Sequence, residues 1–342
     1  MVAFSLEELD IPVVGAPMAG GPSTPELAAA VSEAGGLGFL AGGYLSAERF
    51  AETIEAARAL TSGPLAVNVF VPQQDRSDAD EVQRYCDELA VWAEHYGAQV
   101  GTPRPGDDDG WAAKLDVIAD LAPEVASFTF GCPPAAVLDR LRQRGVLTLV
   151  TVTSAPEAAQ AVRAGADGLV VQGPGAGGHR GTFRTGDEPG AAPLATLLDR
   201  VRAVTDLPLI AAGGLGSAAD VAAVRAGGAV AAQVGTVLLL TEEAGTNPVH
   251  RAALQNPAFS ATVVTRAFSG RYARSLVNDF TRRFDPIAPP AYPELQHLTA
   301  PIRKAAVAAG DPQGASLWAG TAHAAARAGS AGEIVAGLAA GE

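Results

Sequence analysis

The chain has 342 residues, of which 48% are hydrophobic, so it can bury the core of one large domain or of a domain with a lobe. Its formal net charge is −13 and its pI is near 4.8, which argues against sequence-independent nucleic-acid binding, because such binding needs clustered lysine and arginine. No apolar stretch is long enough to span a bilayer, and the N-terminal residues lack the features of a signal peptide. We therefore expect a cytoplasmic protein with no membrane partner.

Short apolar runs alternate with longer alanine-rich stretches along most of the chain. The runs are continuous rather than alternating, which is typical of parallel strands covered by helices. Eight of them are predicted strands, at residues 11–14, 37–40, 65–69, 127–130, 146–152, 168–171, 209–212 and 229–234. The alanine-rich stretches between them predict helices at residues 25–34, 47–60, 135–144, 155–164, 193–204 and 218–226.

This alternation predicts an α/β fold, a (β/α)₈ TIM barrel. The alternative is an open doubly wound sheet, but its fingerprint is missing: no GxGxxG follows the first strand. Residues 72–124 are too long for one crossover and predict an insertion with a helix at 79–96 and a loop at 102–110. We expect the barrel to occupy residues 1–240, and residues 241–342 to form a helical cap packed on it as one continuous unit. In that cap, 301–309 and 330–339 are predicted helices and 282–293 is irregular.

Glycine-rich turns follow the last two predicted strands. The seventh strand ends in AAGGLG (211–216) and the eighth in QVGT (233–236). In this barrel such consecutive turns are the usual place for a phosphate, which backbone N–H groups bind without a lysine. Asn68, Gln172 and Gln233 stand at other strand ends, where a carboxamide can donate to and accept from a heterocycle.

The loop after the sixth strand, QGPGAGGHRG (172–181), contains His179, which can act in proton transfer near neutral pH. With one phosphate site and no ribose-binding acidic residue, this set favours flavin mononucleotide (FMN) over a nicotinamide dinucleotide. Cys86 and Cys132 are far apart and no metal-ligand cluster is visible, so we expect no metal. The arginines at 266, 271, 274 and 282 form a candidate basic patch, with Arg271 or Arg274 as a candidate for a substrate carboxylate.

Seven segments together resemble the FMN-dependent nitronate monooxygenases, formerly called 2-nitropropane dioxygenases, and look most like their bacterial class I. They are APMAGG (16–21), AGGLGFLAGGY (34–44), NVFVP (68–72), SFTFG (127–131), QGPGAGGHRG, AAGGLG and QVGT. The resemblance implies an enzyme that uses O₂ to oxidise an alkyl nitronate, such as propionate 3-nitronate, to a carbonyl compound and nitrite. It also implies a small-molecule substrate and no nucleic acid, and we expect a homodimer.

The same resemblance implies roles for individual residues. His179 would be the catalytic residue, on the substrate side of the flavin. The cofactor-binding residues would be Met18, Asn68, Gln172, Gly177, Gly214, Gln233, Val234, Gly235 and Thr236. One position departs from the family pattern, because Gly175 stands where the family usually has glutamate, which puts the geometry of the loop in question.

A second interpretation remains open at this stage. Flavin-dependent enoyl-acyl-carrier-protein reductases and NADH:quinone reductases share the barrel and several of these segments, so an NAD(P)H-dependent flavin reductase is the alternative. A third is a barrel that binds a flavin or phosphate without redox chemistry.

Overall fold

Eight parallel strands close into a barrel in the computed structural model of the chain, which describes residues 4–72 and 77–340. Its strands are β1 (Val13–Gly15), β2 (Gly38–Ala41), β3 (Leu65–Phe70), β4 (Val125–Thr129), β5 (Leu147–Val152), β6 (Gly168–Gln172), β8 (Leu209–Ala212) and β9 (Ala231–Val234). They lie in the order β1-β9-β8-β6-β5-β4-β3-β2, and a parallel bridge between Val14 and Leu37 joins β1 to β2. All eight predicted strands are confirmed, and so is the (β/α)₈ barrel.

The barrel interior is packed with apolar side chains from successive strands. Val14, Phe39, Leu149, Val170 and Ile210 belong to one buried cluster, and each is at most 3% exposed. A short N-terminal 3₁₀ turn adds Leu6 to the same cluster. The end of the barrel where strands begin is therefore filled, which leaves the opposite end for ligands.

Eight helices surround the strands: α1 (Pro25–Glu33), α2 (Ala47–Leu60), α4 (Trp111–Leu121), α5 (Ala135–Gln143), α6 (Ala155–Ala164), α7 (Leu194–Arg202), α8 (Ala218–Ala226) and α12 (Ala331–Ala339). Several begin with a capping side chain: Thr24, Ser46, Ser154 and Ser217 each accept a hydrogen bond from a first-turn N–H. Helix α4 was not predicted.

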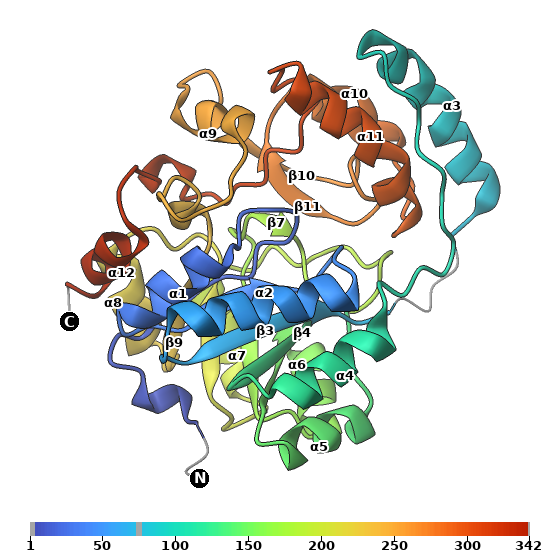
Figure 1. The fold of residues 1–342 in the computed structure, drawn as a ribbon. Coiled ribbons are helices and arrows are strands. Elements are labelled where there is room, and N and C mark those ends of the chain that lie inside the picture. The colour runs from blue at the N-terminus through green and yellow to red at the C-terminus, as the bar shows by residue number, and fades with distance from the viewer. Residues whose placement is uncertain (1–3, 73–76, 341–342) are drawn as a thin grey trace.

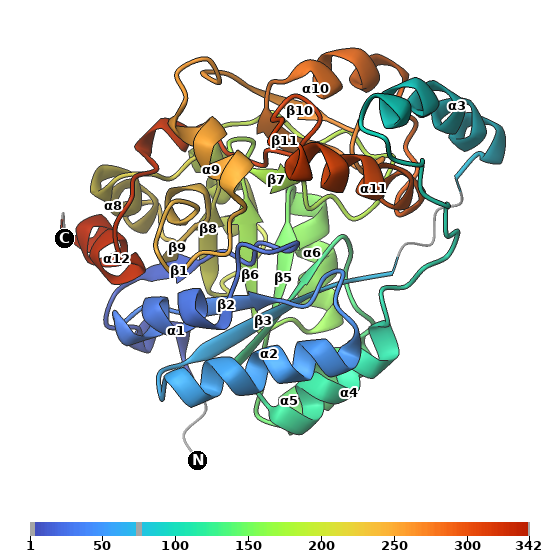
Figure 2. The ribbon, with the colours of Figure 1, turned by 45° about the horizontal axis from the view of Figure 1, so that its top comes forward.

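Helix α12 lies beside α1 and α8, as Figure 2 shows, although it comes last in the chain. Its Ile334, Val335 and Leu338 are buried in the same cluster as the strand–helix layer of the barrel. The helix predicted at 330–339 is thus confirmed, and it completes the ring of helices. The lobe is consequently inserted between β9 and the helix that follows it in the barrel.

The lobe above the barrel mouth is not purely helical. It contains α9 (Pro248–Gln255), α10 (Asp279–Phe284) and α11 (Glu294–Ala308), together with β10 (Thr262–Thr265) and β11 (Ala273–Leu276). These strands form an antiparallel sheet with β7 (Gly178–His179), which belongs to the glycine-rich loop after β6. The predicted helix at 301–309 is real but begins at Glu294, with Pro301 inside it, and part of the segment predicted as irregular lies in α10.

Helix α3 (Ala79–His95) confirms the helix predicted in the insertion, and it packs on the lobe rather than on the barrel wall. Tyr85 and Leu89 share a buried cluster with Phe280, Phe284 and Leu295. Figure 1 shows α3 beside α11, at a distance from the strands. Residues 73–76 of the predicted insertion lie outside the described residues. Within the described ranges, no helix has the length and apolar character needed to cross a membrane.

Candidate functional site

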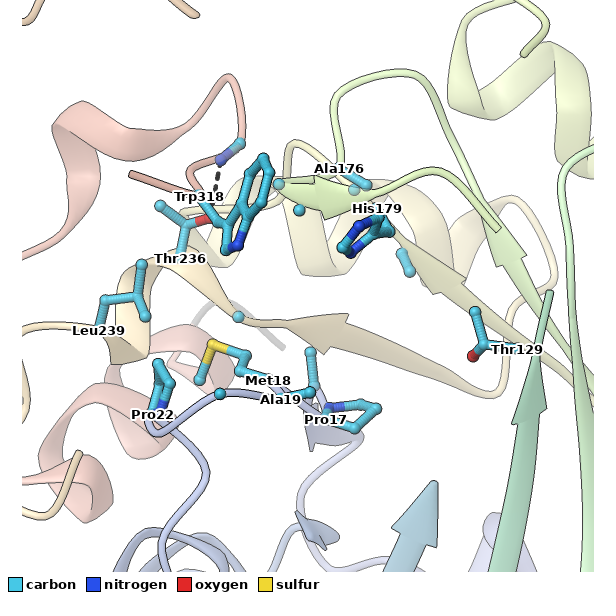
Figure 3. A pocket seen from close by; sticks show the side chains of 18 of the residues that line it. Pro17, Met18, Ala19, Pro22, Thr129, Ala176, His179, Thr236, Leu239 and Trp318 are labelled. Atoms are coloured by element: carbon cyan, nitrogen blue, oxygen red, sulfur yellow. Dashed lines mark hydrogen bonds between the residues drawn. The ribbon is translucent and has the colours of Figure 1, made fainter. Parts of the chain in front are cut away.

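A cavity of about 300 Å³ lies at the C-terminal ends of the barrel strands, beneath the lobe. This is the position of active sites in (β/α)₈ barrels, and the volume is in the range of small-molecule sites. Figure 3 shows Pro17 and Met18 on one side of the cavity, and His179 and Trp318 on the opposite side. The barrel thus supplies the floor, and the loop after β6 and the lobe supply the roof.

Every residue to which the family resemblance gave a catalytic or cofactor-binding role lines this one cavity. The set is Met18, Asn68, Gln172, Gly177, His179, Gly214, Gln233, Val234, Gly235 and Thr236. Parallel strands place their C-terminal ends at one edge, which is why residues so far apart in the chain meet. Their chemical roles remain predictions, whereas their shared location is a property of the structure.

The glycine-rich turns interlock at one end of the cavity, and we call Gly175, Gly177, Gly214, Thr236 and Gly320 the glycine cradle. A Cβ on Gly177 would lie 2.5 Å from the Gly320 nitrogen, and one on Gly175 would lie 3.0 Å from the Gly214 Cα. The Gly320 N–H donates to the Thr236 hydroxyl at 2.9 Å. Among the described residues, the N–H groups of Gly177, Gly214 and Thr236 have no acceptor. Such backbone donors suit an anion.

Gly175 is the position where the family usually has glutamate, and the structure gives a physical reason for glycine in this chain. A Cβ there would come 2.7 Å from the Thr321 hydroxyl oxygen as well as 3.0 Å from Gly214. The Gly175 carbonyl accepts from the Thr321 N–H at 3.0 Å. A side chain at 175 would therefore push the lobe segment at 320–321 away from the loop.

The three strand-end carboxamides are used in different ways. Asn68 is 3% exposed and donates to the Ser127 hydroxyl at 2.8 Å and to the Thr129 hydroxyl at 3.0 Å. Gln172 clamps its own loop, because its Nε2 donates to the His179 carbonyl at 3.0 Å and its Oε1 accepts from the Gly181 N–H at 2.9 Å. Gln233 differs, since its Oε1 is buried without a hydrogen-bond partner within the described chain. That oxygen is an acceptor left for a ligand.

His179 is fixed over the cavity by the small sheet of the lobe. Strand β7 places it opposite Ala273 of β11, and its Nε2 lies 2.8 Å from the Ser269 hydroxyl. The rings of Trp318 and Phe130 have centres 5.3 and 5.5 Å from the imidazole centre. Burial, with the positive charges of Arg271 and Arg303, lowers the pKa of His179 to about 3. The imidazole is therefore neutral near pH 7.

Aromatic rings and one arginine form the other end of the cavity; we call Tyr44, Phe70, Phe130, His179 and Arg303 the aromatic end. Arg303 of α11 donates to the Thr299 hydroxyl at 3.1 Å and to the Gln296 carbonyl at 3.2 Å. Burial lowers its pKa to about 10, so it stays charged at neutral pH. No Asp or Glu is among the described residues that line the cavity, and no described carboxylate pairs with Arg303.

The predicted basic patch does not form at this cavity. Arg271 is buried behind it, donating to the Thr182 carbonyl at 2.7 Å, with its guanidinium 4.2 Å from the centre of the Phe130 ring. Arg274 binds the Pro174 carbonyl, and Arg282 is exposed beside Asp279. Arg303 was not a candidate from the sequence, although it lies within the helix predicted at 301–309, which begins at Glu294 in the structure. Among the described residues, no group of three His, Cys, Asp or Glu side chains could hold a metal ion.

Comparison with known proteins agrees with this geometry. A family model described as nitronate monooxygenase matches residues 5–341. The chain belongs to the nitronate monooxygenase family. It is 41% identical to the nitronate monooxygenase of Paraburkholderia phytofirmans, over 96% of this chain and 92% of that protein. It is 33% identical to a probable nitronate monooxygenase of Staphylococcus aureus, over 91% and 88% of the two chains.

Solved structures give the same result. The nitroalkane oxidase from Streptomyces ansochromogenes is similar, with a TM-score of 0.94 and 49% identity over 98% of this chain and 96% of that chain. FabK from Thermotoga maritima is also similar, with a TM-score of 0.74 and 26% identity over 97% and 93%. The chain is thus an enzyme of a flavin-dependent oxidoreductase family, whose members include nitronate monooxygenases.

Proposed function

We propose that this enzyme binds FMN and uses O₂ to oxidise small alkyl nitronates to a carbonyl compound and nitrite, with propionate 3-nitronate as a candidate substrate. One observation carries the proposal: a single cavity has backbone N–H donors without acceptors at one end, and a neutral histidine beside an arginine without a carboxylate at the other. The first end suits the phosphate of a mononucleotide and the second suits an anionic substrate.

The residues present fit a flavin mononucleotide. The glycine cradle would hold the phosphate through the N–H groups of Gly177, Gly214 and Thr236, as helix and loop N–H groups hold phosphates elsewhere. The orphaned Oε1 of Gln233 would accept from the ribityl chain or the flavin ring, and Met18 would pack against the ring. When bound, the flavin would supply the electron-accepting chemistry.

The chain's own side chains would bind and orient the nitronate. His179, neutral and held at Nε2 by Ser269, can hydrogen-bond the nitronate oxygens without adding a charge. Because a nitronate has already lost its α-proton, we assign His179 to binding and electrostatics; for a neutral nitroalkane it could instead take that proton. Arg303 would attract the nitronate group or the carboxylate of propionate 3-nitronate.

The alternative is an NAD(P)H-dependent flavin reductase of the enoyl-acyl-carrier-protein or quinone type. The similarity to FabK, at 26% identity, is the observation that supports this alternative. A nitronate is small and anionic, however, and the described lining of the aromatic end has Arg303 and no carboxylate. This charge favours the nitronate.

Two parallel assays test the proposal. The first measures O₂ uptake and nitrite release from propionate 3-nitronate, and the second measures anaerobic NADH and NADPH oxidation with a quinone or an enoyl thioester. We expect nitrite release with little reduced-nicotinamide oxidation, and a yellow protein whose released flavin is FMN. Rapid NADH or NADPH consumption without nitrite release would reverse the assignment.

A further inference from the structure

The loop that ends the insertion holds one wall of the cavity in place. Residues 101–110 cross from α11 of the lobe to the β2–α2 turn of the barrel, and we call them the strap. At the lobe, the Gly101 N–H donates to the Leu298 carbonyl at 2.9 Å, and an Asp107 carboxylate oxygen lies 3.0 Å from the His297 Nε2. At the barrel, an Asp109 carboxylate oxygen accepts from the Tyr44 N–H at 3.0 Å.

Tyr44 is held in an unusual backbone conformation at this point. Its φ is 67°, in the left-handed region that a residue with a Cβ rarely adopts. The preceding Gly43 is pressed against Phe70, since a Cβ there would lie 2.3 Å from the Phe70 ring. A conformation of this kind persists only when its surroundings impose it. The hydrogen bond from Tyr44 to Asp109 is one of the contacts that impose it.

Asp109 is in turn held by a buried lysine. Its second carboxylate oxygen lies 2.7 Å from the Lys114 Nζ, and the Lys114 side chain is 1% exposed. The Asp109 N–H also donates to the Asp107 carboxylate at 2.9 Å, which connects the residue that contacts the lobe with the residue that contacts the barrel. Lys114 is one of only two lysines in the chain, and the chemistry proposed above does not use it.

The position of Tyr44 affects the substrate because it is the outermost ring of the aromatic end. Its ring centre is 5.5 Å from that of Phe70, Phe70 is 4.6 Å from Phe130, and Phe130 is 5.5 Å from His179. The same strap is fastened to α11, which carries Arg303. One segment therefore sets the distance between the two sides of the aromatic end.

We propose that Asp109 is a positioning residue that sets the chain length of substrate the enzyme accepts, by holding Tyr44 at the outer edge of the cavity. The inference deepens the proposed function, because it names what limits the alkyl part of an anionic substrate. Loss of the Asp109 acceptor releases Tyr44 from its left-handed conformation, and the cavity opens outward from His179.

Two double variants test this without leaving a buried charge unpaired. Asp109→Gly/Lys114→Met removes the ion pair and the acceptor for the Tyr44 N–H. Asp109→Asn/Lys114→Met removes the same ion pair but keeps an acceptor oxygen. Glycine and asparagine both tolerate the φ of 57° at position 109, so the two proteins differ chiefly in that hydrogen bond.

The experiment measures how tightly the flavin-loaded protein binds straight-chain carboxylates, from acetate to hexanoate. Binding is monitored by the change in flavin absorbance. A carboxylate has the planar, two-oxygen anionic head of a nitronate but is not oxidised. We expect the preference for short chains to weaken by about 10-fold in the glycine variant and to stay near the wild-type value in the asparagine variant. The preference for short nitronates, measured by KM, should likewise weaken in the glycine variant and stay near the wild-type value in the asparagine variant, with kcat little changed.

The outcomes separate this inference from the proposed function. Equal chain-length preference in the glycine variant and the wild type would overturn the role of Asp109, as would a wild-type protein that binds no carboxylate. An equal loss of preference in both double variants would assign the effect to the ion pair and likewise overturn it. If no nitronate is oxidised but the carboxylate series behaves as expected, the proposed function fails while the positioning role stands.

Discussion

The two ends of the cavity differ in whether backbone or side-chain groups form them. The glycine cradle is made mostly of backbone, where strand ends and loops approach so closely that a single Cβ would collide with a neighbour. The aromatic end is made of side chains, and it combines residues of the barrel with Arg303 of α11 and a histidine held by the lobe sheet. The cradle depends on the close approach of backbone segments, whereas the aromatic end depends on side chains that meet where the lobe sits on the barrel.

This difference separates cofactor binding from substrate choice. A backbone cradle can be disrupted by adding atoms, but no side-chain truncation removes its N–H groups. The aromatic end can be disrupted by truncation, because each of its groups belongs to a side chain that can be removed alone. Substitutions at the two ends should therefore have separable effects on flavin affinity and on turnover.

The largest effect is expected from Gly177→Ala in the cradle. The new Cβ would lie 2.5 Å from the Gly320 nitrogen and 2.7 Å from the Ala319 carbonyl carbon, so the loop must shift away from the lobe. We expect the Kd for FMN to rise about 100-fold, equal to ~2.7 kcal/mol, measured by flavin fluorescence titration. The control is Gly186→Ala, where a Cβ meets nothing within 4 Å. Unchanged FMN affinity in Gly177→Ala would mean that the cradle is not the phosphate site.

His179→Asn tests the opposite end. Loss of the imidazole removes the hydrogen-bonding group that faces the substrate but no part of the cradle, so we expect kcat to fall by about 100-fold with FMN still bound. Because the pKa of His179 is about 3, its titration should leave no inflection in the kcat/KM profile between pH 5 and 8. Steady-state assays with flavin quantification measure both. Full activity in this variant would remove His179 from the mechanism.

Arg303→Met sharpens the comparison within the aromatic end. We expect KM for propionate 3-nitronate to rise about 10- to 30-fold, since one charge-assisted hydrogen bond contributes about 1.5–2 kcal/mol. The rise should be smaller for ethyl nitronate, which has no carboxylate. Arg282→Met is the matched control and should change KM less than about 2-fold, because it is an exposed arginine. An equal rise in KM for both substrates in Arg303→Met would argue that Arg303 does not bind the carboxylate of propionate 3-nitronate.

His250 provides the smallest expected effect, on acid stability. It lines the cavity from α9, and burial lowers its pKa to about 4. A histidine whose pKa is lower in the folded protein stabilises the fold above its unfolded pKa near 6.5, and this stability is lost as the pH falls toward 4. Between pH 7.5 and 5.5 the loss is about 1 kcal/mol. Denaturant unfolding of His250→Leu should show a correspondingly weaker pH dependence; an identical slope would contradict a neutral buried His250.

Much of the barrel could be predicted because its signals are local. Continuous apolar runs mark the strands, and serine or threonine caps begin α1, α2, α6 and α8. All eight strands were predicted to within two residues of their ends. The site residues at strand ends followed from the same pattern. Helix α4 was missed because the loop before it is rich in glycine and aspartate, and the start of α11 was missed because Pro301 lies inside the helix. The expected homodimer stays a prediction.

The lobe shows the limit of local reasoning most clearly. Nothing in the sequence around Gly178 and His179 predicts a strand, since the pair becomes one only by hydrogen bonding to β11, far along the chain. The same holds for the strap. The sequence shows Asp109 only as a loop residue, and its contacts with Tyr44 and Lys114 appear only in the folded structure. Such contacts depend on the packing of distant segments and leave no periodic signal.

The sequence alone therefore determined the barrel, the glycine turns and the histidine loop, because each rests on residue spacing and backbone preference within a short segment. Only the tertiary structure decided that α12 completes the barrel ring, that Arg303 rather than Arg271 or Arg274 lines the cavity, and that Asp109 restrains Tyr44. Each of these requires two or more segments to meet in space. Their energies come from burial and from hydrogen bonds that form only once the lobe is seated on the barrel.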